Sequence, residues 1–331
     1  MTWSSISSCD HCGGTWRETS EALICRSCGK TIQTVTDWVK LDTEPLLPDR
    51  PAYKGQIGEP SAEYMRVFRS HYRPIMDAAP LDRSELRVLE LGAGLGRTTQ
   101  AFVREYAPAL YIASEPFSSL AVQLRQSLNA WDYRWPKGVA ANYNANCAPL
   151  LRPGAVNVIL GNSVLHHILD YECGLEHWHE VLDTPGIMIF GEPIKEGWVY
   201  WTSLVLAVLQ AWRGGTVELA QKSADTLERH SRIMRERIAN HDNRSYLAGL
   251  DDKHMFSPLK MMALADRLHM SLSVHKLSRD VLQLMRIRLE RIGVAETDAR
   301  TVLDYLREIV PVGIQDTAMS DFAAMFVFRK V

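Results

Sequence analysis

The most constraining feature of the sequence is a glycine-rich segment that directly follows a short apolar stretch. Residues 88–91, Val-Leu-Glu-Leu, predict a buried strand, and glycines follow at alternate positions, Gly92, Gly94 and Gly96. A strand, a glycine turn and a helix in this order bring a nucleotide-like ligand against bare backbone in α/β proteins. The dinucleotide pattern needs Gly-x-Gly-x-x-Gly, and here the third glycine comes one residue too early. Glu90, inside the strand, favours a ligand with a cationic amine over a pyrophosphate.

A second acidic residue is expected at the same edge of the sheet. Residues 110–115 predict the next strand, which ends in Glu115. Because parallel strands bring their carboxyl ends to one edge, Glu115 is expected beside the glycine turn, where a carboxylate accepts hydrogen bonds from a ribose diol. The alternative is that Glu115 only stabilises the N-terminus of the helix expected over residues 117–130.

The glycine segment resembles the first motif of the Rossmann-like, class I methyltransferases that depend on S-adenosylmethionine (SAM). A later segment, Asn162-Ser-Val-Leu-His-His167, resembles a loop of those members of the family that act on small molecules. The resemblance implies an α/β fold with a seven-stranded Rossmann-like sheet and helical insertions, and it implies SAM as the cofactor. The residues that it implies for cofactor binding are Glu90, Gly92, Ala93, Gly94, Gly96, Glu115, Asn144 and Asn162.

Asn144 and Asn162 are included in this set because of where they lie relative to the expected strands. The family often has an aspartate where Asn144 stands, bonded to the adenine amino group, and the side-chain oxygen of Asn144 keeps this contact without the charge. The alignment also permits a slip by two residues, onto Asn142 or Asn146. Asn162 is expected near the methionine part of SAM.

The catalytic candidates are His166 and His167. Imidazole titrates near neutral pH, so either ring is suited to take a proton from the acceptor as the methyl group arrives. The alternative is structural, with one histidine capping the next helix and the other packed against the sheet. Many methyltransferases also work mainly by aligning the nucleophile in a dry pocket, and then no base is needed.

Other parts of the body fit the same architecture. Further strands are expected over residues 139–143, 156–161, 187–193, 271–277 and 323–329, with the last one inserted antiparallel as in the family. A helix over residues 61–79 precedes the glycine strand, and its apolar residues recur at helical spacing.

Four of the six cysteines form two Cys-x-x-Cys pairs near the N-terminus, Cys9 with Cys12 and Cys25 with Cys28. Two such pairs suit tetrahedral Zn²⁺. A glycine follows each pair, which lets the chain turn so that backbone amides point at the sulfurs. The alternative of two disulfides is disfavoured, because no secretory signal precedes the pairs and the body is of the α/β class.

Short strands are expected around the cysteine pairs, over residues 15–18, 22–24 and 32–35, and together they predict a zinc ribbon. The segment resembles small zinc-ribbon proteins that partner some tRNA and protein methyltransferases, although Asp37-Trp38 replaces the usual glycine turn. Because this segment is too short to bury a hydrophobic core that could stabilise it, the metal must supply its folding energy. The sequence leaves open whether the ribbon is architectural or contacts the substrate.

The sequence predicts three regions: a zinc ribbon at 1–41, a linker rich in proline and glycine at 42–60, and a methyltransferase domain at 61–331. Helical insertions are expected at about 195–254 and 279–311. The first holds an apolar stretch at 198–212. This stretch could form an aromatic wall of the substrate site. An equally good interpretation is a helix that packs on the body of the domain or on a second subunit in a homodimer.

Composition limits the partners. The chain of 331 residues carries a net charge of −2, so no global field attracts nucleic acid. No membrane span or secretory signal is found, which predicts a cytoplasmic protein. The expected function is transfer of a methyl group from SAM to a small-molecule acceptor at oxygen, nitrogen or carbon. The alternative is an rRNA or tRNA methyltransferase whose zinc ribbon contacts RNA.

Overall fold

The computed structural model describes residues 7–9, 11–19, 22–35, 38–40, 60–130, 138–142, 151–277, 281–310 and 322–331. The chain divides into two compact units. The first unit comprises Met1–Phe190, Met262–Ser273 and Val327–Val331, and the second comprises Gly191–Met261 and Val274–Phe326. The expected linker falls on residues 42–60, of which only Pro60 is described.

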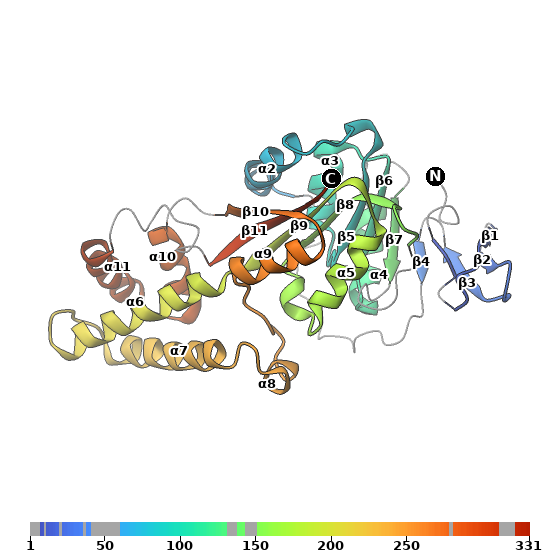
Figure 1. The fold of residues 1–331 in the computed structure, drawn as a ribbon. Helices are drawn as coiled ribbons and strands as arrows, with labels where there is room; N and C mark the ends of the chain where they lie inside the picture. The colour runs from blue at the N-terminus through green and yellow to red at the C-terminus, as the bar shows by residue number, and fades with distance from the viewer. Residues whose placement is uncertain are drawn as a thin grey trace. The chain divides into compact units, whose positions relative to one another are not determined.

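The first unit is built on a β-sheet (Figure 1). Its strands are β1 (Trp16–Glu18), β2 (Ala22–Cys25), β3 (Thr31–Val35), β4 (Trp38–Lys40), β5 (Arg87–Leu91), β6 (Leu110–Ser114), β7 (Gly138–Asn142), β8 (Val156–Asn162), β9 (Leu182–Pro193), β10 (Ser271–Lys276) and β11 (Ala323–Lys330). Among the described residues the order is β1-β2-β3-β4-β7-β6-β5-β8-β9-β11-β10. β9, β10 and β11 also have residues in the second unit.

The centre of the sheet is parallel. β5 pairs in parallel with both β6 and β8, and β6 pairs in parallel with β7. Every residue of β6 is buried, as is β8 up to Gly161, which is typical of parallel strands covered on both faces. Mainly apolar runs without regular alternation of polar residues therefore mark these strands in the sequence.

The α/β class is confirmed, but the expected number of seven strands in the sheet is wrong. β4 pairs antiparallel with β3 and parallel with β7, so the strand order continues from the body into the N-terminal segment. Among the described residues this gives a sheet of eleven strands. The first three strands form the expected antiparallel ribbon, with Cys25 opposite Trp16.

Helices accompany the sheet of the first unit. They are α2 (Ala62–Asp77), α3 (Arg97–Tyr106), α4 (Ser118–Ala130), α5 (Tyr171–Val181) and α9 (Pro258–Arg267), of which α9 begins in the second unit, with short 3₁₀ turns η1 (Arg83–Glu85) and η2 (Leu165–His167). The Ser61 hydroxyl caps α2 by accepting a hydrogen bond from the Tyr64 amide. Phe68 of α2 stacks on Tyr72 and meets Phe102 of α3 edge-on, which fixes α2 against α3.

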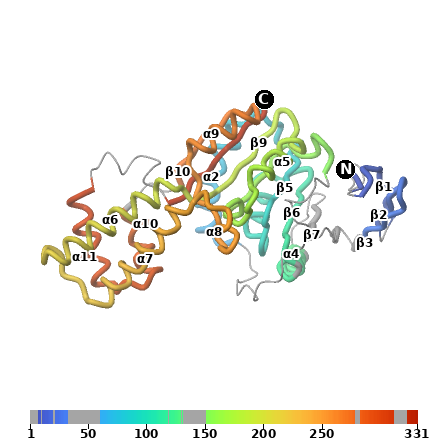
Figure 2. Tube along the Cα trace, turned by 60° about the horizontal axis from the view of Figure 1, so that its bottom comes forward, coloured from blue at the N-terminus to red at the C-terminus, as the bar shows by residue number. Residues whose placement is uncertain are grey.

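The second unit is mainly helical (Figure 2). It contains α6 (Lys195–Arg213), α7 (Gln221–Ala239), α8 (Arg244–Ala248), α10 (Val281–Ile292) and α11 (Glu296–Ile309). α6 packs on α7 and α11, and α10 packs on α11. Their apolar faces share one core, in which Trp201, Leu227 and Leu306 are fully buried. In the part of the chain that the structure describes, no helix combines the length and apolarity needed to cross a membrane.

Candidate functional site

The glycine turn joins β5 to α3 in left-handed backbone. Gly92, Gly94 and Gly96 all have positive φ, at 62°, 56° and 82°. A Cβ at Gly92 would lie 2.9 Å from the Val164 side chain, whereas a Cβ at Gly94 would meet nothing within 4 Å. The Ala93 amide donates to the Ser114 carbonyl at 2.9 Å, which ties the turn to β6. The turn therefore presents bare backbone with open space over Gly94.

Glu115 lies beside this turn, where the sequence places it. Its side chain is buried, and Oε2 accepts a hydrogen bond from the Gly94 amide at 2.9 Å. Oε1 accepts from the Phe117 amide at 3.1 Å, just before α4, so the interaction at the helix start that the sequence left open is present as well. The two are compatible, because each carboxylate oxygen can accept more than one hydrogen bond.

Glu90 lies on the buried side of the same turn. Its carboxylate accepts hydrogen bonds from the Thr99 hydroxyl of α3 and, at 2.8 Å, from the Tyr111 hydroxyl of β6. Burial is the main cause that raises the pKa of Glu90 to about 7. The structure thus joins β5, α3 and β6 through Glu90, and direct contact with a ligand amine stays a prediction.

Thr99 and Tyr111 were not predicted from the sequence. The strand register contains a usable signal, because Tyr111 pairs with Val88 and side chains alternate between the two faces of a strand. Glu90 and Tyr111 therefore share one face, as diagonal neighbours. Thr99 has no comparable signal, since its contact depends on the angle at which α3 leaves the turn.

Replacing Glu90 by glutamine should change how stability depends on pH. The folded-state pKa of Glu90 lies above its ordinary 4.5, so unfolding between about pH 4.5 and pH 7 releases a proton. Raising the pH through this window therefore lowers the free energy of unfolding of the wild type, by up to about 3 kcal/mol. Glu90→Gln cannot ionise and should lack this loss. Urea unfolding at about pH 5 and about pH 8 measures it, and parallel pH profiles for the two proteins would contradict the assignment.

Asn162 and the two histidines follow β8. Gly161 pairs with Leu91, so Asn162 comes level with Gly92 at the carboxyl edge of the sheet. Ser163 has a φ of 58°, and the chain then forms η2, which contains both histidines. His166 is buried and His167 half-buried, with ring centroids 4.1 Å apart. The structure therefore brings Gly92 and Asn162 to one edge, while the histidines' catalytic role stays a prediction.

The adenine-binding position cannot be assessed in the same way. Asn144 lies outside the described residues, as does Asn146. Asn142 is the last residue of β7. The predicted contact with the adenine amino group therefore stays a prediction.

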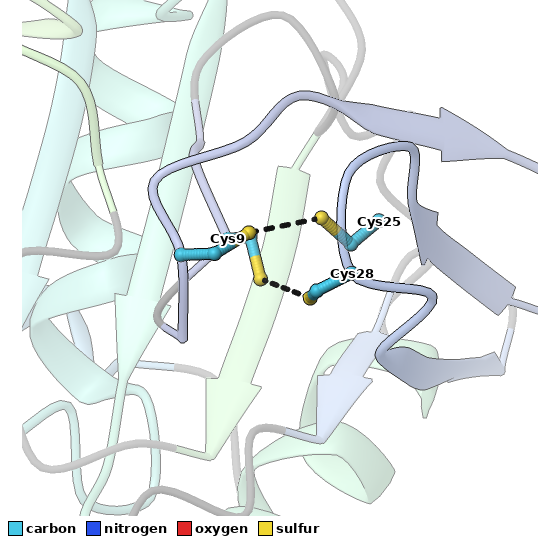
Figure 3. Close-up of side chains that lie close together, drawn as sticks. Cys9, Cys25 and Cys28 are labelled. Atoms are coloured by element: carbon cyan, nitrogen blue, oxygen red, sulfur yellow. Dashed lines mark hydrogen bonds between the residues drawn. The ribbon is translucent and has the colours of Figure 1, made fainter.

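The four N-terminal cysteines come together in the ribbon. Figure 3 shows Cys9, Cys25 and Cys28 of this cluster. The sulfur atoms of Cys9, Cys12, Cys25 and Cys28 all lie within 4.8 Å of one another. Sγ of Cys9 is 3.6 Å from that of Cys28, and Sγ of Cys12 is 3.5 Å from that of Cys25. Four sulfurs about 2.3 Å from a tetrahedral zinc ion would be about 3.8 Å apart, so the cluster fits this metal. These thiols are free rather than joined in disulfides.

The turns after the cysteine pairs have the expected form. Gly13 and Gly29 have φ values of 70° and 76°, and an added Cβ would meet nothing within 4 Å at either one, so the left-handed backbone is what requires glycine there. The Ser27 amide donates to Sγ of Cys25 at 3.4 Å. A hydrogen bond from the Cys28 backbone is the main cause that lowers the pKa of Cys25 to about 6. These amides favour the thiolate form of Cys25, and the thiolate is the form that binds metal.

Comparison with known proteins gives distant similarities. No protein-family model matches the chain. An uncharacterized methyltransferase of Oceanobacillus iheyensis is 26% identical over 148 residues, which are 44% of this chain and 64% of that protein. A non-reducing polyketide synthase of Didymella fabae is 26% identical over 137 residues, which are 40% of this chain and 5% of the synthase. The chain thus spans less than two thirds of the length of these relatives.

The similarity to solved structures is also low. A geranyl diphosphate C-methyltransferase from Streptomyces coelicolor, in complex with S-adenosyl-L-homocysteine, matches with a TM-score of 0.46 and 12% identity, covering 83% of this chain and 84% of that one. The YcgJ protein of Bacillus subtilis matches with a TM-score of 0.45 and 13% identity, covering 80% and 98%.

Proposed function

We propose that this chain is a SAM-dependent methyltransferase of class I that acts on a small-molecule acceptor. The observation that carries the proposal is the Glu115 carboxylate held against the Gly94 amide at the carboxyl edge of parallel strands. An acid beside a bare-backbone turn suits a ligand with a ribose diol. The similarity to a bacterial protein described as a methyltransferase supports the same class.

The proposed donor site uses residues in or directly after the neighbouring strands β5, β6 and β8, together with Asn144. Glu115 would accept hydrogen bonds from the ribose hydroxyls, and the backbone of Gly92, Ala93, Gly94 and Gly96 would lie along the ligand. Asn162 would bind the methionine part from the end of β8, and Asn144 the adenine. Glu90, on the buried side of the turn, would bind the cationic amine of the ligand. When bound, SAM would supply a methyl group on a sulfonium, which is electrophilic without help from a metal.

The histidines are proposed to serve the acceptor. His166 or His167 would hold or accept the acceptor's proton while the nucleophile is aligned with the methyl group. Alignment alone also accelerates such a transfer, so a histidine variant should reduce the rate without abolishing it.

The N-terminal segment is proposed to be a zinc ribbon. Cys9, Cys12, Cys25 and Cys28 would hold one Zn²⁺, and four sulfur ligands leave no open position for catalysis. The parallel pairing of β4 with β7 supports an architectural role, because it makes the ribbon a continuation of the sheet.

Methyl transfer can be measured with SAM labelled in its methyl group. We expect incorporation of label into a small-molecule fraction of a cell extract and none above background into purified rRNA or tRNA. The net charge of −2 favours this outcome, because RNA binding depends largely on neutralising phosphates. Strong incorporation at specific RNA sites would instead establish the RNA alternative, with the ribbon as a contact module.

A further inference from the structure

The helical second unit contains an aromatic cluster that includes Trp201 of its hydrophobic core and side chains packed against that core. Trp198 and Trp201 lie on α6, His230 on α7, and Phe322 just before β11. The Phe322 ring centroid is 5.1 Å from that of Trp198 and 5.7 Å from that of Trp201. His230 lies 6.4 Å and 6.5 Å from the same two rings. Trp201 is buried, whereas Trp198, His230 and Phe322 remain partly exposed.

The side chain of Arg288 stacks on one ring of this cluster. The guanidinium carbon of Arg288, on α10, lies 4.2 Å from the centroid of Trp198. At this distance the guanidinium is stacked on the indole, a cation–π contact. Arg288 is only partly exposed, and burial is the main cause that lowers its pKa to about 10, so it stays charged at neutral pH.

The cluster is rich in donors and poor in acceptors. Nε of Arg288 and Nε1 of Trp198 are buried and have no hydrogen-bond partner among the described residues. Nε1 of Trp201 donates to Nε2 of His230 at 3.2 Å, so the proton of the neutral imidazole is on Nδ1, a further donor. Burial lowers the pKa of His230 to about 4, which keeps this ring neutral. The cation–π contact with Trp198 explains the position of the Arg288 guanidinium. It does not explain why the indole N–H of Trp198 is buried without a hydrogen-bond acceptor.

The surrounding charge is also positive. Among the described groups that act on Arg288, Arg291 and Arg237 are cationic and only Asp252 is acidic. Arg237 donates a hydrogen bond to the Asp252 backbone carbonyl. No carboxylate pairs with Arg288 in the described part of the chain. A half-buried cation with no carboxylate in direct contact is unfavourable, and an anionic ligand would reduce that cost.

We propose that the second unit binds an anionic ligand with a planar apolar body, held by Arg288 and Trp198. The guanidinium suits a carboxylate or phosphate oxygen pair, the indole N–H donates a further hydrogen bond, and the rings cover the apolar part. The ligand class is therefore an aromatic or conjugated acid or phosphate ester.

The site can be tested on the full-length protein with three probes that share one ring system: 2-naphthoate, 2-naphthyl phosphate and neutral 2-naphthamide. Calorimetry should show that at least one anion binds roughly 10-fold more tightly than the amide, because a hydrogen bond to a charged group is the stronger one. The anion that binds more tightly identifies the ligand as a carboxylate or a phosphate. Equal affinity for anions and amide, or no binding of any probe, would overturn the proposal.

The variant Arg288→Gln should lose this preference, with a roughly 10-fold weaker anion affinity and an unchanged amide affinity. Arg288→Lys keeps the charge without the planar fork, so it should retain part of the preference even where the glutamine variant folds poorly. Arg235→Gln removes an exposed cation from α7 and is the matched control. An anion affinity as low in the control as in Arg288→Gln would overturn the assignment. SAM affinity, measured in parallel, tests the proposed function separately.

Discussion

Cys25→Ser is expected to abolish metal binding by the N-terminal ribbon. A serine hydroxyl is a far poorer zinc ligand than a thiolate, and the remaining three sulfurs cannot complete a tetrahedral site. The described ribbon is short, and its core consists of residues such as Trp16, Leu23 and Ile32, so the metal must supply most of its stability. The apparent contribution of structural zinc is about 10–16 kcal/mol in isolated zinc-finger peptides, which makes this the largest effect expected from a single substitution.

Elemental analysis should find about one zinc per chain in the wild type and almost none in Cys25→Ser, in line with a single four-cysteine site. Amide hydrogen exchange should report loss of protection in β1 to β3 of the variant. Cys173→Ser is the control, because this exposed thiol on α5 lies outside the cluster and its loss should leave the zinc content unchanged. A wild type that contains no metal yet protects the amides of β1 to β3 would contradict the zinc assignment.

Local signals in the sequence account for most of the first unit. Positive φ is required at Gly92, Gly94 and Gly96, so their spacing predicts the shape of the turn as well as its place. The strand ends that carry Glu115 and Asn162 follow from buried apolar runs that stop at a polar residue. Because parallel register then brings those ends to one edge, the neighbourhood of the turn is predictable without any long-range information.

What the sequence could not predict depends on contacts between distant segments. Pairing of β4 with β7 joins residues about a hundred positions apart, and three-residue strands have almost no periodicity of their own. The donor-rich cluster of the second unit likewise needs α6, α7 and α10 to meet, and the charge pattern of α10 alone resembles a solvated helix face. Arg288 is partly buried, whereas its neighbours Arg286 and Arg291 are exposed. This difference depends on tertiary packing and cannot be predicted from the sequence.

Glu115→Ala should weaken SAM binding by roughly 100-fold, because the substitution removes a charged acceptor whose hydrogen bonds to the ribose contribute about 1.5–3 kcal/mol each. It also leaves the Gly94 amide without its present partner, which loosens the turn at the point where the ligand is expected. Calorimetric titration with SAM measures the loss. Glu115→Gln retains one acceptor oxygen and no charge, so its affinity should fall between those of the wild type and the alanine variant.

Glu85→Ala provides the matched control for this experiment, since it removes an exposed carboxylate from η1, two residues before β5. Its SAM affinity should equal that of the wild type. Thermal unfolding of all variants separates a lost ligand contact from a lost fold, because a folded Glu115→Ala protein with weak binding locates the effect in the site. Wild-type affinity in a folded Glu115→Ala protein would mean that the acid only fixes the turn and the start of α4, and the donor site would then have to lie elsewhere on the sheet.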